Sequence, residues 1–190
     1  MRRRQQLLAA GLVVTAVLVG HQLTKGPGAR PAVDPGPVPS PAVPVGAFAA
    51  RIDRVVDGDT FLATVAGGGG PVRVRVIGVD TPETVKPGVA VRCYGPQASA
   101  FTKHLLPAGT IVEAAHETGG DVDRYGRQLW DVWLPDGRFL ESVLAAAGTA
   151  RAYPYPPQTR HAALIRSLAD AARAGRRGLW APPCRGQSFS

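Results

Sequence analysis

Residues 48–76, FAARIDRVVDGDTFLATVAGGGGPVRVRV, predict three consecutive β-strands. The first two are Phe48–Val56 and Thr60–Val65, because both runs are rich in β-branched and bulky apolar residues. Asp57 and Gly58 lie between them and form a favourable pair for a tight hairpin turn. The stretch therefore begins with a β-hairpin.

The third strand, Val72–Val76, follows a glycine-rich tip at residues 67–70. Valine and arginine alternate along it, so the valines share one face and Arg73 and Arg75 share the other. This alternation predicts that Arg75 lies on the face away from the core, directly before an acidic loop.

Two further strands and three helices are expected downstream. Strands are predicted at Thr110–Ala115 and Gln128–Leu134. Apolar residues at helical spacing predict helices at Pro96–Leu106 and Pro157–Ala174, and an Ala-rich run ended by Gly148 predicts a short one at Leu140–Ala147. Five strands with a helix between the third and the fourth predict an α+β fold, a five-stranded OB-type β-barrel with about three helices.

The N-terminus has the pattern of an export signal. Arg2, Arg3 and Arg4 precede the apolar stretch Leu7–Gly20. A cleaved signal peptide and a retained signal-anchor, tethering the chain to a membrane through residues 7–23, both fit this pattern, and a buried core helix is the third alternative. Either of the first two places the rest of the chain outside the cytoplasm, secreted or membrane-anchored.

The composition divides the chain into four parts. Residues 1–23 are the signal or anchor, residues 24–46 a linker rich in Pro, Gly and Ala, residues 47–185 one folded domain and residues 186–190 a tail. We expect a monomer. The formal net charge is +8, but from Arg51 onward 17 basic and 13 acidic side chains leave only +4, so charge alone is weak support for a nucleic-acid partner.

The chain has two cysteines, Cys93 and Cys184. In an exported protein an isolated pair predicts a disulfide, here between the loop before the first helix and the C-terminal tail. A metal site built on two cysteines lacks the usual ligand spacing.

Two acidic motifs and two arginines carry the chemistry. Asp57 and Asp59 flank a glycine in a turn, and a second acidic loop, Asp80–Glu83, follows the third strand. Arg75 and Arg127 lie at neighbouring strand ends. Taken singly, Asp-Gly is a good turn and the arginines are surface ion-pair partners, but their conjunction favours a common site.

That site has oxygen ligands and no His or Cys cluster, which favours Ca²⁺ or Mg²⁺ over zinc or copper. A planar guanidinium donates two parallel hydrogen bonds to a phosphate. Acidic loops with paired arginines therefore predict metal-assisted cleavage of a phosphodiester bond.

The order and spacing of these motifs resemble the staphylococcal nuclease (thermonuclease) family. The resemblance covers about Ala49 to Trp180 and includes Tyr94-Gly95-Pro96 and Gly178-Leu179-Trp180. It implies a calcium-dependent nuclease that binds one Ca²⁺. Such an enzyme hydrolyses DNA, RNA or both and leaves 3′-phosphate ends.

The resemblance also implies a role for each site residue. Asp59, Asp80 and the backbone carbonyl of Thr81 would bind Ca²⁺. Asp57 would support these ligands without contacting the ion itself. Glu83 would orient or deprotonate the attacking water, and Arg75 and Arg127 would clamp the phosphate. The substrate contacts would be Arg124, Tyr125, Leu129, Tyr153 and Tyr155.

Tyr153 and Tyr155 also fit simple packing around a proline-rich turn. Two functions remain open beside an enzyme. The first is a non-catalytic OB module that binds nucleic acid, and the second is an exported adhesion or interaction domain. A binding module would not need the intact set of carboxylates and arginines.

Overall fold

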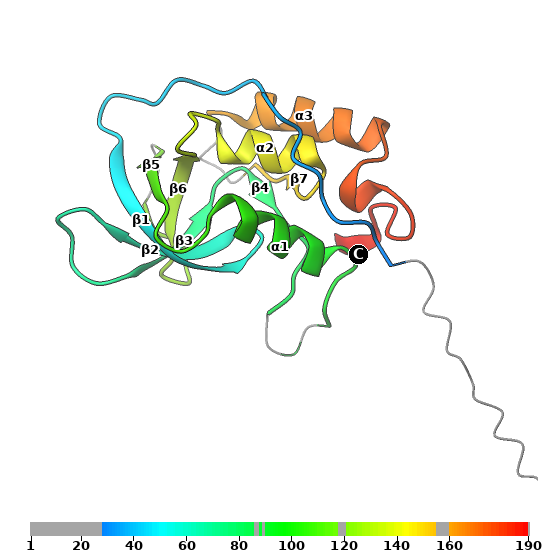
Figure 1. Cartoon of the computed structure of the whole chain (residues 1–190), viewed down its shortest axis with the longest axis horizontal. Coiled ribbons are helices and arrows are strands. Elements are labelled where there is room, and N and C mark those ends of the chain that lie inside the picture. Colours follow the sequence, from blue (N-terminus) through cyan, green and yellow to red (C-terminus); the bar gives the residue numbers. More distant parts are fainter. Residues whose placement is uncertain (1–27, 86–87, 89, 118–120, 155–159, 190) are drawn as a thin grey trace, which may run out of the picture.

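The computed structural model describes residues 28–85, 88, 90–117, 121–154 and 160–189 (Figure 1). The predicted signal or anchor at residues 1–23 lies outside the described residues, as does Tyr155. Within the described part of the chain, no helix is both long enough and apolar enough to cross a membrane.

Five strands form a closed barrel, which confirms the predicted fold (Figure 1). The strands are β1 Phe48–Asp57, β2 Thr60–Val65, β3 Val72–Val76, β5 Ile111–Ala115 and β6 Gln128–Trp133. Their order around the barrel is β1-β2-β3-β6-β5, and every pairing is antiparallel except that of β3 with β6.

The alternation of valine and arginine along β3 decides which of its side chains face the barrel core. Val74 and Val76 are fully buried in its core beside Phe61 and Trp130. Arg75 points the other way and is half-buried. The same strand thus supplies the core on one face and a cation on the other.

Among the described residues, three α-helices lie outside the barrel. They are α1 Gly95–Leu105, α2 Leu140–Ala147 and α3 Ala162–Ala174. Every residue of α2 is buried, and α2 packs against both α3 and β6. It ends at Gly148, whose φ of 71° is the left-handed conformation that glycine adopts at low cost.

The predicted start of the third helix at Pro157 is not supported at its described residues. Arg160 and His161 form a turn, and the helix begins at Ala162. The rest of the predicted start, residues 157–159, lies outside the described residues.

Two short strands outside the barrel have no signal in the sequence pattern. They are β4 Val79–Asp80 and β7 Arg151–Ala152, which pair antiparallel and bring Asp80 opposite Arg151. Each has only two residues, too few to show a period.

Residues 28–46 form a strap without helix or strand that lies along the domain (Figure 1). The composition predicts the irregular backbone, but the strap is not a free spacer. Trp133 Nε1 donates to the Pro41 carbonyl at 2.8 Å, and the Phe139 amide donates to Ser40 Oγ at 3.0 Å. Arg138 pairs with Asp34 at 2.7 Å. Nothing in the composition of residues 28–46 shows these docking points, because their partners lie about a hundred residues away.

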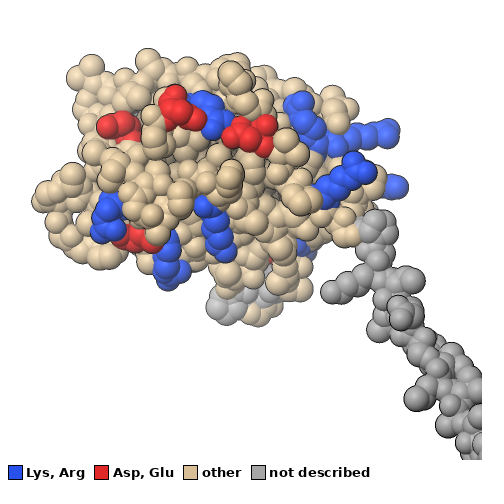
Figure 2. Space-filling view, viewed as in Figure 1, with Lys and Arg blue, Asp and Glu red and all other residues tan. Residues whose placement is uncertain are grey.

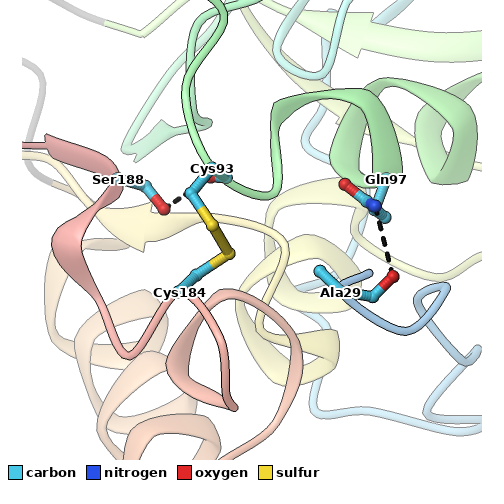
Figure 3. The surroundings of a disulfide bond; sticks show 5 residues. All are labelled: Ala29, Cys93, Gln97, Cys184 and Ser188. Atoms are coloured by element: carbon cyan, nitrogen blue, oxygen red, sulfur yellow. Dashed lines mark hydrogen bonds between the residues drawn. A yellow bond between two sulfur atoms is a disulfide. The ribbon is translucent and has the colours of Figure 1, made fainter. Parts of the chain in front are cut away.

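The disulfide between Cys93 and Cys184 is present, as predicted (Figure 3). Beside it, Ser188 Oγ donates to the Cys93 carbonyl at 2.6 Å, and Gln97 on α1 donates to the Ala29 carbonyl of the strap at 3.2 Å. The expected tail at residues 186–190 is therefore fixed at Ser188, which is buried.

We expect reduction of this disulfide to lower the free energy of unfolding measurably, by up to about 4–5 kcal/mol, because the bond closes a long loop in the unfolded chain. Urea unfolding with and without dithiothreitol measures the difference. A Cys93→Ala/Cys184→Ala variant is the control, since reductant must not change its midpoint. Equal midpoints for the native chain under both conditions would contradict the prediction.

Candidate active site

The two acidic loops and both arginines meet in one cleft of about 650 Å³ on the outside of the barrel. All the predicted site residues among the described residues line it: Asp57, Asp59, Arg75, Asp80, Thr81, Glu83, Arg124, Tyr125, Arg127, Leu129 and Tyr153. Tyr155 lies outside the described residues, so its predicted contact stays a prediction.

The first acidic turn is bound directly to the second acidic loop. Asp59 Oδ2 accepts hydrogen bonds from the amide of Thr81 at 2.9 Å and from its hydroxyl at 3.1 Å. A Cβ on Gly58 would lie 2.7 Å from Thr81 Oγ1, so only glycine allows this approach without displacing Thr81. Gly58 thus serves the site as well as the turn.

Asp59 and Asp80 face the same arginine. Arg75 Nη2 lies 3.4 Å from Asp59 Oδ2 and 3.4 Å from Asp80 Oδ1, and Arg75 Nη1 donates to the Val76 carbonyl. Burial raises the pKa of Asp80, and the charge of Asp59 raises it further, while Arg75 and Arg151 lower it. Two carboxylates are therefore held close enough to repel each other, with cations offsetting the repulsion.

The Asp57 carboxylate is held by two hydrogen bonds from Thr84. Its Oδ1 accepts from the Thr84 hydroxyl at 2.7 Å and its Oδ2 from the Thr84 amide at 3.0 Å. Burial raises the pKa of Asp57 despite these hydrogen bonds, and an interaction with the Glu83 side chain also raises it. Asp57 thus connects the first turn to the loop that carries Glu83.

Glu83 is the last residue of the second acidic loop. Its Oε1 accepts from the amides of Thr84 at 3.1 Å and Val85 at 3.0 Å. Two backbone donors fix the carboxylate at the rim of the cleft.

Arg127 is oriented by Asp123, four residues earlier. Arg127 Nε and Nη2 each lie 2.7 Å from Asp123 Oδ2, and the Arg127 amide donates to Asp123 Oδ1 at 3.0 Å. Burial raises the pKa of Asp123, but these hydrogen bonds and one from Tyr125 outweigh it, so the pKa is lowered. Asp123 therefore stays ionised and holds the guanidinium in place.

Of the predicted substrate-binding residues, Tyr125 and Tyr153 are exposed at the cleft and Leu129 is buried. Arg124 Nη2 donates to the Tyr125 hydroxyl at 2.7 Å, and Tyr125 is 65% exposed. Tyr153 is 42% exposed, whereas Leu129 is only 4% exposed and offers little surface to a substrate. Exposed rings at a cleft are suited to stacking on nucleic-acid bases.

The donor atoms present fit a hard divalent cation. Asp59 and Asp80 bring two carboxylates together, and the Thr81 carbonyl belongs to the same loop, which gives an all-oxygen set. Within the described ranges, no group of three or more His, Cys, Asp and Glu side chains forms a metal centre by itself. A cation here would be held by two side chains, backbone and water.

Three residues of the site were missed by the sequence analysis: Thr84, Asp123 and Arg151. Asp123 had a local signal, because it stands four residues before Arg127 in the DRYGR motif. Thr84 and Arg151 had none, since their partners lie 27 and 71 residues away.

The comparisons with known proteins agree with this geometry. The family described as "Staphylococcal nuclease homologue" matches residues 73–182. A protein named thermonuclease from Staphylococcus intermedius is 43% identical over 130 residues, covering 68% of this chain and 74% of that protein. One of the same name from Staphylococcus hyicus is 40% identical over 131 residues, covering 68% of this chain and 74% of that protein.

A more distant relative, named endonuclease YncB, comes from Bacillus subtilis. It is 36% identical over 130 residues, covering 68% of this chain and 60% of that protein. With more than half of its residues matched and a relative at 43% identity, the chain belongs to the staphylococcal nuclease family.

Proposed function

We propose that this protein is an exported, Ca²⁺-dependent nuclease that cuts DNA, RNA or both and leaves 3′-phosphate ends. That it hydrolyses phosphodiester bonds rests on its family and on relatives named thermonuclease and endonuclease. The observation that carries the metal-dependent chemistry is the convergence of two acidic loops and two arginines on one cleft.

In this proposal Asp59, Asp80 and the Thr81 carbonyl hold the ion, and Asp57 supports them through its bonds to the neighbouring loop. Bound Ca²⁺ would polarise the phosphoryl oxygens and offset their charge. Glu83 would take or orient a proton of the attacking water. Arg75 and Arg127 would each donate two parallel hydrogen bonds to the phosphate as negative charge builds on it.

Substrate binding follows from the walls of the cleft. Arg124 keeps a positive charge beside the exposed ring of Tyr125, and Tyr153 offers a second ring. Aromatic faces accept any base, which suits a nuclease with little sequence preference.

The charge of the outer surface also favours a polyanion. Figure 2 shows Lys and Arg side chains at the end of the molecule where the C-terminal part of α3 and the C-terminal segment lie. From Ala162 to Phe189 the chain has five arginines and one acidic residue, Asp170. Such a surface would attract nucleic acid, and the attraction must weaken as salt is added.

Export is proposed from the sequence of the N-terminus, Arg2–Arg4 followed by the apolar stretch 7–20. The disulfide is consistent with an oxidising compartment. Secretion and a membrane tether through residues 7–23 both fit, and fractionation of producing cells with detection of the cleaved or uncleaved N-terminus distinguishes them. A monomer is proposed as well, to be checked by light scattering.

Cleavage of single-stranded DNA by the purified chain in millimolar Ca²⁺, and then in excess chelator, tests the ion. We expect degradation that stops on chelation, resumes when Ca²⁺ is restored and leaves 3′-phosphate ends. Activity that survives exhaustive chelation would rule out metal dependence.

The same assay addresses the non-catalytic binding module. Salt-sensitive binding of DNA by folded protein, without cleavage in Ca²⁺, Mg²⁺ or Mn²⁺, would favour that alternative.

A further inference from the structure

Asp80 is held by an arginine that the sequence motifs do not include. Arg151 Nε lies 3.0 Å and Nη2 2.8 Å from Asp80 Oδ2, and the two residues are opposite each other in the β4–β7 pair. The other oxygen, Oδ1, faces Arg75. One side of the carboxylate is thus fixed by Arg151 and the other is turned toward Arg75, which Asp59 also faces.

Arg151 is itself held by the C-terminal segment. Its guanidinium carbon lies 4.0 Å from the centre of the Phe189 ring and 5.6 Å from that of Tyr153. Stacking of a guanidinium on an aromatic face restricts its orientation and is favourable in energy.

The segment that carries Phe189 is anchored in turn. Phe189 ends the short 3₁₀ helix Gln187–Phe189, in which Ser188 is buried and donates to the Cys93 carbonyl at 2.6 Å. The disulfide joins Cys93 to Cys184, just before this helix (Figure 3). A continuous set of contacts therefore runs from the disulfide through Phe189 and Arg151 to Asp80.

We propose that Arg151, stacked on Phe189, is a positioning residue that orients Asp80 for cation binding, so that the C-terminal segment completes the site. The inference rests on the proposed function, since it takes Asp80 as a metal ligand. Hydrogen bonds from behind a ligating carboxylate fix the direction of its free lone pairs, and loss of such partners typically weakens metal binding by about 10–100-fold.

The test is Ca²⁺ affinity measured by titration calorimetry on the full chain without substrate. We expect Arg151→Met to raise the Kd for Ca²⁺ by about 10–100-fold and Arg151→Lys to recover part of the loss. Phe189→Leu should raise it by roughly threefold to tenfold, because only the stacking partner is lost. Cleavage by Arg151→Met should return toward the wild-type rate at saturating Ca²⁺.

Arg166→Met is the matched control, because Arg166 is exposed on α3 and lies outside the cleft. Its Kd should equal that of the wild type. Urea unfolding of each variant in chelator separates a general loss of stability from a specific loss of affinity. If Arg151→Met proves unfolded, the Phe189→Leu variant decides, and a Kd within twofold of the wild type overturns the proposal.

The outcomes separate this inference from the proposed function. Ca²⁺ binding and cleavage by the wild type, with Arg151→Met within twofold in Kd, overturn the inference alone. A wild type that neither binds Ca²⁺ nor cleaves in its presence overturns both.

Discussion

Glu83→Gln is expected to lower the turnover number by about 10²–10⁴-fold, the contribution of a positioned acid–base group. The amide keeps the shape of the side chain but has no charge with which to take or orient a proton of water. The two amides that donate to Oε1, those of Thr84 and Val85, can donate to the amide oxygen of glutamine as well. The fold and the Ca²⁺ affinity should therefore remain unchanged. Single-turnover cleavage measures the rate, urea unfolding the stability and calorimetry the Ca²⁺ affinity.

Glu113→Gln is the control for this substitution. Glu113 lies on β5, is exposed, and lies outside the cleft, so the same chemical change there should leave cleavage unaltered. Near-normal turnover of Glu83→Gln would refute the assigned role. Loss of Ca²⁺ binding along with activity would instead make Glu83 part of the metal site.

The second large effect concerns a buried acidic cluster away from the cleft, made of Glu117, Asp131 and Glu141. Asp131 is 2% exposed and its Oδ2 lies 3.5 Å from His161 Nε2, while Glu141 is fully buried and its Oε1 accepts from the Val132 amide at 3.2 Å. Glu117 accepts from the Arg160 amide. Three acids thus share an interior region beside one imidazole and one guanidinium.

Burial raises the pKa of Asp131 from its ordinary value of 3.8 to about 7, helped by the charge of Glu117 and opposed by Arg160. Burial and the charge of Asp131 also raise the pKa of Glu141. The imidazole does not offset this, because burial lowers the pKa of His161. In the folded chain Asp131 and Glu141 therefore retain protons that the unfolded chain has released.

The sign of the pH dependence follows from this difference. The contribution of Asp131 to stability is fully present below about pH 4, where both states are protonated, and is lost as the pH rises through about 7. Each unit of difference is about 1.4 kcal/mol, so the loss amounts to roughly 4 kcal/mol at pH 8.

Asp131→Asn removes this titration while keeping the side-chain shape. We expect the free energy of unfolding of the variant to equal that of the wild type near pH 4. At pH 8 it should be higher than that of the wild type by up to about 4 kcal/mol. Urea unfolding from pH 4 to pH 8 measures it. Asp170→Asn, at an exposed position of α3, is the control and should give parallel curves. A difference between Asp131→Asn and wild type that does not change with pH would contradict the prediction.

Much of the barrel could be predicted because its signals are local. The alternation of Val72–Val76 fixed which side chains face the core, and Gly148 marked the end of α2. The boundaries of β2 and α2 agree with the predictions residue by residue. Periodicity and turn residues act over a few positions, so they can be recognised in the sequence without knowledge of the fold.

The motifs of the site were also legible, because each is short and contiguous in the chain. That they share one cleft was an inference from their conjunction, and the structure brings Asp59 to Thr81 across 22 residues. What the motifs could not contain is the residues that hold them. Thr84 and Arg151 look like ordinary loop and strand residues until the barrel closes.

The sequence by itself determined the fold class, the two acidic motifs and the two arginines that meet at the cleft, and the pairing of two cysteines. Only the tertiary structure decided that residues 28–46 dock on the domain, that Asp131 and Glu141 share a buried region, and that Arg151 and Phe189 stand behind Asp80. The physical reason is separation along the chain: a strand or turn is specified by its own neighbours, whereas these contacts join segments that meet only after the barrel and its helices have packed.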